Sequence, residues 1–285
     1  MEFRTVVDIP KAPFQIEPAE RVLLVGSCFA GEVGSRFCDN GFAAMVNPYG
    51  TMYNPASILH TVRRLLTEAD GQQSAPPAAI PSTVFLTLGT NHVYRLKETG
   101  EIVDNCAKRP AALFREEQLS VSECTDYLRQ TAELLLARNA GVHVVFTVSP
   151  IRYRKYGYHG SQLSKATLLL AVDELLHPAA PSPLSAHLSY FPAYEIFCDE
   201  LRDYRFYAPD MLHPSEQAVD YVWERLVDWC FSPAARAFMD EWRPIRQALQ
   251  HRPFQADSDE YRRFRQQTQE KLEAFRSRYP QFVAQ

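Results

Sequence analysis

The stretch RVLLVGSCFAGEVGSRFC, residues 21–38, decides the fold. Its branched apolar run, Val22 to Val25, predicts a buried strand that stops at Gly26. Apolar residues then recur at the spacing of an amphipathic helix: Phe29, Val33 and Phe37. A hydroxyl and a thiol, Ser27 and Cys28, therefore stand side by side where a buried strand turns into a helix. Nucleophiles of acyl-transfer enzymes are presented at such joints.

Strand and helix patterns alternate along residues 22–230. This alternation is typical of a parallel sheet with helices on both faces, so we expect a three-layer α/β sandwich of flavodoxin-like type. The charged segment that follows, residues 233–285, is predicted to be helical with one apolar stripe. We therefore expect one domain over residues 1–232 and a helical extension over 233–285, packed on it or on a second copy of the chain. Residues 71–82, rich in Pro and Ala, predict an exposed linker.

The composition argues against several classes of protein. The 285 residues are 46% hydrophobic and 22% charged, which is ordinary for a globular protein, and the net charge of -4 does not favour nucleic-acid binding. No apolar run reaches the length of a membrane span. The six cysteines are scattered, without CxxC pairs or zinc-type spacing with histidine. We expect free thiols, no metal and no cofactor, in the reducing environment of the cytoplasm.

The segment YAPDMLHPSEQAV, residues 207–219, supplies a base and its orienting group. Asp210 and His213 are three residues apart in a turn before a helix. At that spacing the carboxylate can accept the Nδ1 hydrogen of the imidazole, which leaves Nε2 for a nucleophile. A D-x-x-H pattern alone more often only caps a turn. An upstream nucleophile at a strand-to-helix joint makes acyl transfer the better interpretation.

Four polar turns follow predicted strands: 26–28, 47–50, 89–91 and 149–150. In an open parallel sheet such turns meet at one edge, where sites form, and we expect His213 to face them. Acyl transfer also needs hydrogen-bond donors for the oxyanion. The candidates are the backbone N–H of Gly50 and the side-chain amide of Asn91 or of Asn105.

Two further segments carry charge near these turns. The loop RYRKYGYHGSQ, residues 152–162, is basic and aromatic, which suits contact with a carboxylate or phosphate and closure over a substrate. The segment LRDYRFY, residues 201–207, predicts a buried ion-pair network beneath Asp210, made by Arg202, Asp203 and Arg205.

The order of these elements, with an early nucleophile and a late D-x-x-H pair, resembles the SGNH (GDSL-like) esterase superfamily. A narrower resemblance, to the GSCFA-domain family, covers nearly the whole chain and rests on GSCFA, NPYGTMYNP, GTNHVY, VDNCAK, VSPIR, QLSKA, FPAYEI and DELRDYRFYAPDMLHPS. It implies an SGNH-type fold. Two histidines common in the family are Ala107 and Tyr153 here, and Asn91 with His92 replaces an apolar pair.

The nucleophile stays open between two neighbours. If Gly26 is aligned with the glycine of the GDSL motif, Cys28 takes the nucleophile position. If Ser27 is aligned with the serine of that motif, Ser27 is the nucleophile. A helix N-terminus and a nearby imidazolium lower the pKa of a thiol, which favours Cys28. The competing interpretation is that Cys28 is a small buried apolar residue without chemistry.

We therefore predict an SGNH-type acyl-transfer enzyme, either an esterase- or thioesterase-like hydrolase or an acyltransferase, acting through a covalent acyl-enzyme on Cys28 or Ser27. Its substrate would be a small-molecule or carrier-bound acyl group. The residues expected to contact it are His92, Arg152, Tyr153, Lys165 and Arg205. The alternative is a non-catalytic module that keeps the pocket and binds a small molecule or partner, because two histidines of the family are missing.

Overall fold

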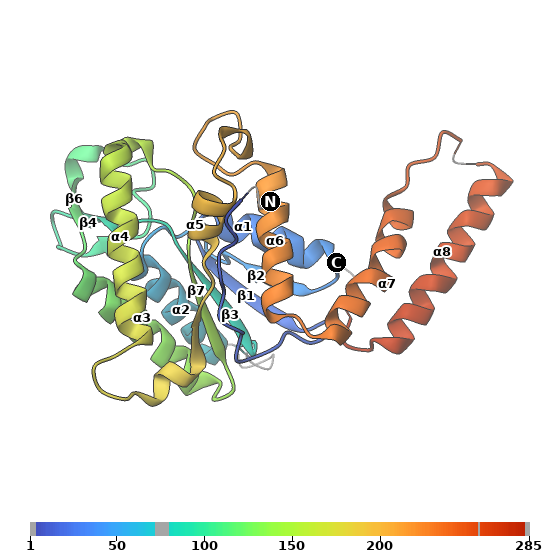
Figure 1. Ribbon diagram of the computed structural model, residues 1–285, viewed down its shortest axis with the longest axis horizontal. Coiled ribbons are helices and arrows are strands. Elements are labelled where there is room, and N and C mark those ends of the chain that lie inside the picture. The colour runs from blue at the N-terminus through green and yellow to red at the C-terminus, as the bar shows by residue number, and fades with distance from the viewer. Residues whose placement is uncertain (1–3, 72–79, 256, 283–285) are drawn as a thin grey trace.

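The computed structural model describes residues 4–71, 80–255 and 257–282, so most of the expected linker at 71–82 lies outside the described residues. Among these residues, five parallel strands form the central sheet, in the order β2-β1-β3-β7-β8 (Figure 1). The strands are β1 (Arg21–Gly26), β2 (Ala43–Val46), β3 (Thr83–Leu88), β7 (His143–Val148) and β8 (Leu188–Tyr190). This order is that of flavodoxin-like folds.

Helices cover both faces of the sheet, which confirms the predicted three-layer sandwich (Figure 1). Successive strand side chains point to opposite faces. Leu23 and Val25 of β1 accordingly pack with α2 (Pro55–Gly71), α3 (Val121–Arg138) and α4 (Gly157–Leu176). Val22 and Leu24 pack with α1 (Cys28–Asp39) and α6 (Glu216–Cys230). In the described part of the chain, no helix combines the length and apolarity needed to cross a bilayer.

A second, antiparallel sheet was not anticipated from the sequence pattern. Within the described ranges it has three strands in the order β5-β4-β6. They are β4 (His92–Leu96), β5 (Ile102–Val103) and β6 (Phe114–Gln118). Because β4 begins just after β3 ends, this small sheet stands at the carboxyl edge of the central sheet. The remaining short helical segments are α5 (Ala193–Glu195) and single turns at 111–113, 154–156, 183–187, 196–200 and 204–206.

The C-terminal segment forms a pair of helices, α7 (Pro233–Gln250) and α8 (Asp259–Arg278), beside the sandwich (Figure 1). The Trp242 indole donates to the carbonyl of Asp39 at 3.1 Å, and Arg246 pairs with the carboxylate of Asp39 at 2.8 Å. The ring of Phe275 on α8 lies 5.1 Å from that of Phe238 on α7. The extension thus packs on α1, while the domain boundary at residue 232 stays a prediction.

The start of α3 is fixed by a capping box. The N-cap of α3 is Ser120, whose hydroxyl accepts the N–H of Glu123, and the Glu123 carboxylate returns a bond to the N–H of Ser120 at 2.8 Å. A Ser with an acid three residues on is the signature of a capping box. Ser122, the next serine along the chain, lies inside the helix.

The joint between β1 and α1 depends on a glycine. Gly26 has φ +149°, and a Cβ placed there would lie 2.1 Å from the carbonyl oxygen of Thr87 on β3. A side chain at this position must therefore separate β1 from β3 or change the backbone conformation. The close approach brings the ends of two neighbouring strands together.

We predict that Gly26→Ala lowers the free energy of unfolding by about 2–4 kcal/mol, from backbone strain and the clash with β3. Gly31→Ala is the matched control on α1, because nothing lies within 4 Å of a Cβ there. It should stabilise the chain by roughly 1 kcal/mol through helix propensity. Urea unfolding of both variants measures this difference. Equal midpoints for wild type and Gly26→Ala would contradict it.

Candidate active site

The four predicted turns lie at one edge of the sheet, since the strands that precede them run parallel. The backbone N–H of Ser27 donates to the carbonyl of Thr87 at 3.0 Å. From the other side, Asn47 accepts the N–H of Gly26 at 2.8 Å through its Oδ1. The strand-to-helix joint is therefore held by residues from both neighbouring strands.

His213 faces this joint. Its Nε2 lies 3.6 Å from Sγ of Cys28, a hydrogen-bond distance for sulfur. Its Nδ1 lies 2.5 Å from Oδ2 of Asp210. The other oxygen of Asp210 accepts the backbone N–H groups of Leu212, at 2.9 Å, and of His213, at 3.0 Å. The structure thus brings Cys28, His213 and Asp210 into one line of contacts.

Asp210 is held as a carboxylate. The backbone N–H groups of His213 and Leu212, and then the His213 side chain, lower the pKa of Asp210 to about 2. A carboxylate that accepts several N–H bonds prefers its charged form. The charged group faces Nδ1, so the hydrogen of neutral His213 belongs on Nδ1 and the lone pair on Nε2 faces the thiol.

The turn that carries these two residues is braced by Arg152. The Arg152 guanidinium donates to the carbonyl of Met211 and lies 4.1 Å from the ring centroid of Tyr207. Its backbone N–H donates to the carbonyl of Leu212 at 3.1 Å. Arg152, expected to contact substrate, is therefore engaged in holding the turn that presents His213.

The ion-pair network expected beneath Asp210 is wrong as a buried feature. Arg202, Asp203 and Arg205 are all exposed, and Arg205 lies 3.5 Å from Asp203 at the surface. The apolar neighbours Phe206 and Tyr207 take the inward positions instead. Arg205, expected to contact substrate, shows no contact with Cys28 or His213 in the described part of the chain.

The two neighbouring nucleophile candidates lie in different environments. The Ser27 side chain is fully buried, and its Oγ has no hydrogen-bond partner in the described part of the chain. The Cys28 side chain is only partly buried and faces His213. Consecutive residues at a helix start point in different directions, so only one of them can meet the imidazole in this arrangement.

The expected lowering of the Cys28 pKa is wrong. Burial raises the pKa of the thiol, and this effect exceeds the lowering by the backbone N–H groups of Cys28 and Phe29. Desolvation disfavours the charged form of any buried acid. The sulfur therefore rests as a thiol and needs a base to become nucleophilic.

The predicted oxyanion donors are occupied or placed elsewhere. The N–H of Gly50 donates to the carbonyl of Asn47 at 2.8 Å. Asn105 is exposed, and its Oδ1 accepts the N–H of Ala107 at 2.7 Å. The amide of Asn91 donates to the carbonyl of Leu119 at 2.7 Å. None of the three shows a hydrogen bond to Cys28 or His213 in the described residues.

Lys165 is a buried lysine at the carboxyl edge of the sheet. Its side chain is 1% exposed, and its Nζ donates to the carbonyls of Gly89, at 2.7 Å, and Ser149, at 2.6 Å. These two carbonyls follow the ends of β3 and β7. Lys165 therefore ties two of the four turns together, rather than extending into solvent to meet a substrate.

Two aromatic residues predicted to contact substrate lie beside Lys165 and the small sheet. The ring of His92 stacks on that of Tyr156 with centroids 3.5 Å apart, and burial lowers the pKa of His92. The hydroxyl of Tyr153 is buried and has no hydrogen-bond partner in the described residues. The ring of Tyr153 lies 4.9 Å from Nζ of Lys165.

Comparison with protein families identifies the chain. The model of the GSCFA family matches residues 21–79 and 72–226, and that of the GSCFA domain protein, C-terminal domain, matches residues 242–284. The chain belongs to the GSCFA family. No curated protein sequence matches it.

Solved structures similar to this GSCFA chain include three esterases. A carbohydrate esterase family 2 enzyme from Corynascus thermopiles is 14% identical, with a TM-score of 0.46 over 81% of this chain and 69% of that chain. A carbohydrate esterase family 3 protein from Talaromyces cellulolyticus is 10% identical, with a TM-score of 0.40 over 78% and 99%. An acetyl xylan esterase from Butyrivibrio proteoclasticus is 11% identical, with a TM-score of 0.42 over 74% and 63%.

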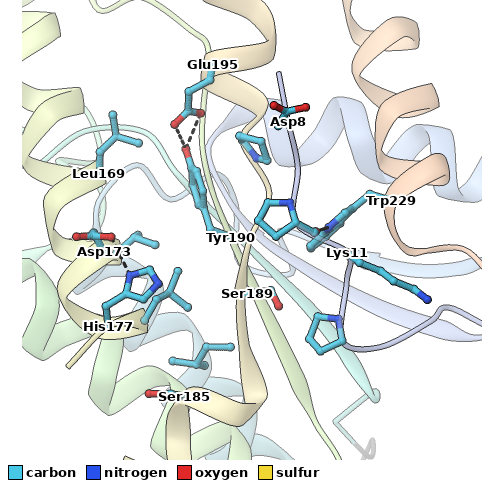
Figure 2. A pocket seen from close by; sticks show the side chains of 16 residues that line it. Asp8, Lys11, Leu169, Asp173, His177, Ser185, Ser189, Tyr190, Glu195 and Trp229 are labelled. Carbon is cyan, nitrogen blue, oxygen red and sulfur yellow. Dashed lines mark hydrogen bonds and ion pairs between the residues drawn. The ribbon is translucent and has the colours of Figure 1, made fainter. Parts of the chain in front are cut away.

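A separate hollow of about 550 Å³ lies over β8, between α4 and the N-terminal segment of the GSCFA chain (Figure 2). Two pairs of its polar side chains are in contact: the hydroxyl of Tyr190 donates to Glu195, and Nδ1 of His177 lies 2.9 Å from Oδ1 of Asp173 (Figure 2). Its lining does not include Cys28, His213 or Asp210. The hollow is therefore distinct from the candidate active site.

Burial of Lys165 in the GSCFA chain predicts a pH dependence of stability. Burial lowers the pKa of Lys165 from 10.5 to about 7. Between these values the unfolded chain binds a proton that the folded chain does not, so the free energy of unfolding rises with pH. Each pKa unit corresponds to about 1.4 kcal/mol, so the rise amounts to several kcal/mol. Urea unfolding between about pH 7 and 10 should show this rise, and Lys165→Met should remove it.

The control for this experiment is Lys271→Met, which removes an exposed lysine on α8. It should keep the pH dependence of wild type. Identical slopes in the wild-type and Lys165→Met proteins would show that Lys165 does not carry the effect.

Proposed function

We propose that this chain catalyses acyl transfer with Cys28 as nucleophile, His213 as base and then acid, and Asp210 as the group that orients His213. The observation that carries the proposal is the line of contacts from Sγ of Cys28 to Nε2 of His213, at 3.6 Å, and from Nδ1 to Asp210, at 2.5 Å. A nucleophile in reach of a base that is itself oriented by a third group is the general arrangement for covalent acyl transfer.

The proposed reaction has two steps. His213 takes the thiol proton as sulfur attacks the acyl carbon, so a C–S bond forms and the carbonyl electron pair moves to oxygen. The intermediate collapses, the bond to the leaving alcohol or thiol breaks, and His213 returns the proton to that group. In the second step, water or another acceptor gives its proton to His213 and attacks the thioester. The C–S bond then breaks, and the sulfur regains a proton.

The start of α1 supports the negative charge of the first intermediate. The N–H groups of Cys28 and Phe29 approach the sulfur and act against the effect of burial on its pKa. Free N–H groups in the first turn of a helix favour a nearby negative charge. Such groups are suited to stabilise an oxyanion that forms next to the sulfur.

Esters and thioesters are the proposed substrate class, as small molecules or on a carrier. A thioester on Cys28 exchanges readily with thiols and other acceptors, so the same intermediate serves hydrolysis and transfer. The proposed contacts for the remainder of the substrate are His92 and residues of the segment 152–162. The six cysteines are free thiols, and we extend the proposal to a reducing compartment such as the cytoplasm.

The test incubates the purified chain with p-nitrophenyl acetate and, separately, with an acetyl thioester of a small thiol. Acyl transfer predicts release of nitrophenol above the rate without protein and a mass increase of one acetyl group on the intact chain. Faster loss of that adduct with an added amine or alcohol would identify an acyltransferase; loss in water alone, a hydrolase. If the protein releases no nitrophenol above the background rate and forms no acetyl adduct with either donor, the binding-module alternative replaces the proposal.

A further inference from the structure

The hydroxyl of Tyr153 is a buried polar group without a partner in the described residues. The residue itself is firmly placed. Its N–H donates to Oγ of Ser161 at 3.2 Å, and its ring lies edge-on to that of Tyr53, with centroids 6.1 Å apart. Buried hydroxyls in folded proteins are normally hydrogen-bonded, so an unpartnered hydroxyl in a well-packed place calls for an explanation.

The hydroxyl lies at the carboxyl edge of the sheet, against Gly89. A Cβ placed on Gly89 would lie 2.3 Å from the oxygen of Tyr153, so the absence of a side chain at residue 89 makes room for the hydroxyl. Gly89 follows β3, the strand that pairs with β1, and β1 leads directly to Cys28. The hydroxyl of Tyr153 therefore lies at the end of the strand that neighbours β1.

Electrostatics connects this hydroxyl to the sulfur. A negative charge on Cys28 adds to the effect of burial, and together they hold the pKa of Tyr153 well above its usual value. Tyr153 therefore remains protonated, and its O–H remains a donor, over the range in which proteins function. Nζ of Lys165 lies 4.9 Å from the centroid of the Tyr153 ring and donates to the carbonyls of Gly89 and Ser149.

Two of the donors that the sequence analysis assigned to the oxyanion are already bonded elsewhere. The amide of Asn91 donates to Leu119, and the N–H of Gly50 donates to Asn47. The Tyr153 O–H has no acceptor among the described residues, although its position and protonation suit a donor. An acyl oxygen that becomes negative beside Cys28 would supply the missing acceptor.

Resting on the acyl transfer proposed above, we propose that Tyr153 is a further catalytic residue, whose hydroxyl donates a hydrogen bond to the oxyanion. As sulfur bonds to the acyl carbon, the carbonyl electron pair moves onto oxygen, and the Tyr153 O–H bonds to that oxygen without giving up its proton. When the intermediate collapses, the pair returns to the C=O bond and the hydrogen bond weakens. His213 carries out the proton transfers.

The test compares two reactions of the same sulfur. Acylation of Cys28 by p-nitrophenyl acetate forms an oxyanion, whereas alkylation by iodoacetamide displaces iodide and forms none. Tyr153→Phe keeps the ring and removes only the hydroxyl. We expect it to slow acylation by about 10²–10³-fold, the usual effect of losing one oxyanion donor. Alkylation of Cys28 by iodoacetamide should stay within about twofold of wild type, because this step develops no charge on oxygen.

A second measurement separates this role from a structural one. The hydroxyl has no partner in the resting protein, so Tyr153→Phe should leave the melting temperature unchanged or raise it. Tyr261→Phe is the control, since Tyr261 is a half-buried tyrosine on α8, outside the proposed site. It should leave acylation, alkylation and melting temperature at wild-type values.

The outcomes separate the two proposals. If wild type forms an acetyl adduct on Cys28 and Tyr153→Phe forms it as fast, the role of Tyr153 is wrong while the proposed function stands. An equal fall in acylation and alkylation would also overturn it, because Tyr153 would then only position Cys28. If wild type forms no adduct on Cys28, the proposed function itself fails, and the role of Tyr153 fails with it.

Discussion

Replacing His213 by Ala is expected to slow acylation of Cys28 by about 10²–10⁴-fold, the usual contribution of a general base. The effect is large because burial raises the pKa of the Cys28 thiol, so thiolate is scarce near neutral pH. Nε2 of His213 lies 3.6 Å from that sulfur and is the base in reach. Nitrophenol release from p-nitrophenyl acetate, followed at about pH 7, measures the loss.

The chain contains a matched control for this variant. His60 also pairs with a carboxylate, with Nδ1 2.8 Å from Oδ1 of Asp104, and it too is partly exposed. His60 lines a hollow with Gly50 and Asn105, and the lining of this hollow does not include Cys28, His213 or Asp210. His60→Ala should acylate as fast as wild type. A similar loss in both variants, or none in His213→Ala, would contradict the assigned base.

The pH dependence of labelling adds a second readout to His213→Ala. Without an internal base, the thiol must lose its proton to solvent, so iodoacetamide labelling should be slow near neutral pH and recover as the pH rises toward the raised pKa of Cys28. Wild type, in which His213 takes the proton, should label faster in the neutral range. Equal profiles for the two proteins would show that His213 does not act on the sulfur.

The second large effect concerns the nucleophile. Cys28→Ala should abolish acyl-enzyme formation and leave release of nitrophenol at the rate without protein. Ser27→Ala should keep activity within a few-fold of wild type, because Ser27 Oγ is buried and has no partner in the described residues. Its stability should be unchanged or higher, since an unpartnered buried hydroxyl is removed. The reverse pattern, with activity lost only in Ser27→Ala, would assign the serine.

Much of the fold was predictable because it depends on local patterns. Consecutive residues show the apolar run of β1, the helical spacing of α1 and the alternation of strands and helices that follows. Parallel strands then bring their carboxyl ends to one edge of the sheet. The small sheet of β4, β5 and β6 was not predictable in this way. Its strands are short and largely half-exposed, and what holds them is pairing with each other across distant positions.

The contact between the proposed nucleophile and base was predictable from the sequence, whereas the environment of these two residues was not. The contact between Cys28 and His213 follows from a strand-to-helix joint and a D-x-x-H turn that meet at one edge. Three features of the site depend on how distant elements pack: the bond that Asn91 donates, the burial of Lys165, and the Tyr153 hydroxyl, which has no partner among the described residues. The same holds for the raised pKa of Cys28, since burial, which no motif encodes, outweighs the helix N-terminus.

The most direct test of the central claim is the location of the acyl group during turnover. The wild-type reaction would be quenched in acid while p-nitrophenyl acetate is in excess, and the protein would then be digested. Mass spectrometry would sequence the peptide that contains Ser27 and Cys28. We predict acetyl on the sulfur of Cys28, removed by neutral hydroxylamine as a thioester is. Acetyl on the oxygen of Ser27, or turnover with no acetyl on this peptide, would contradict the account.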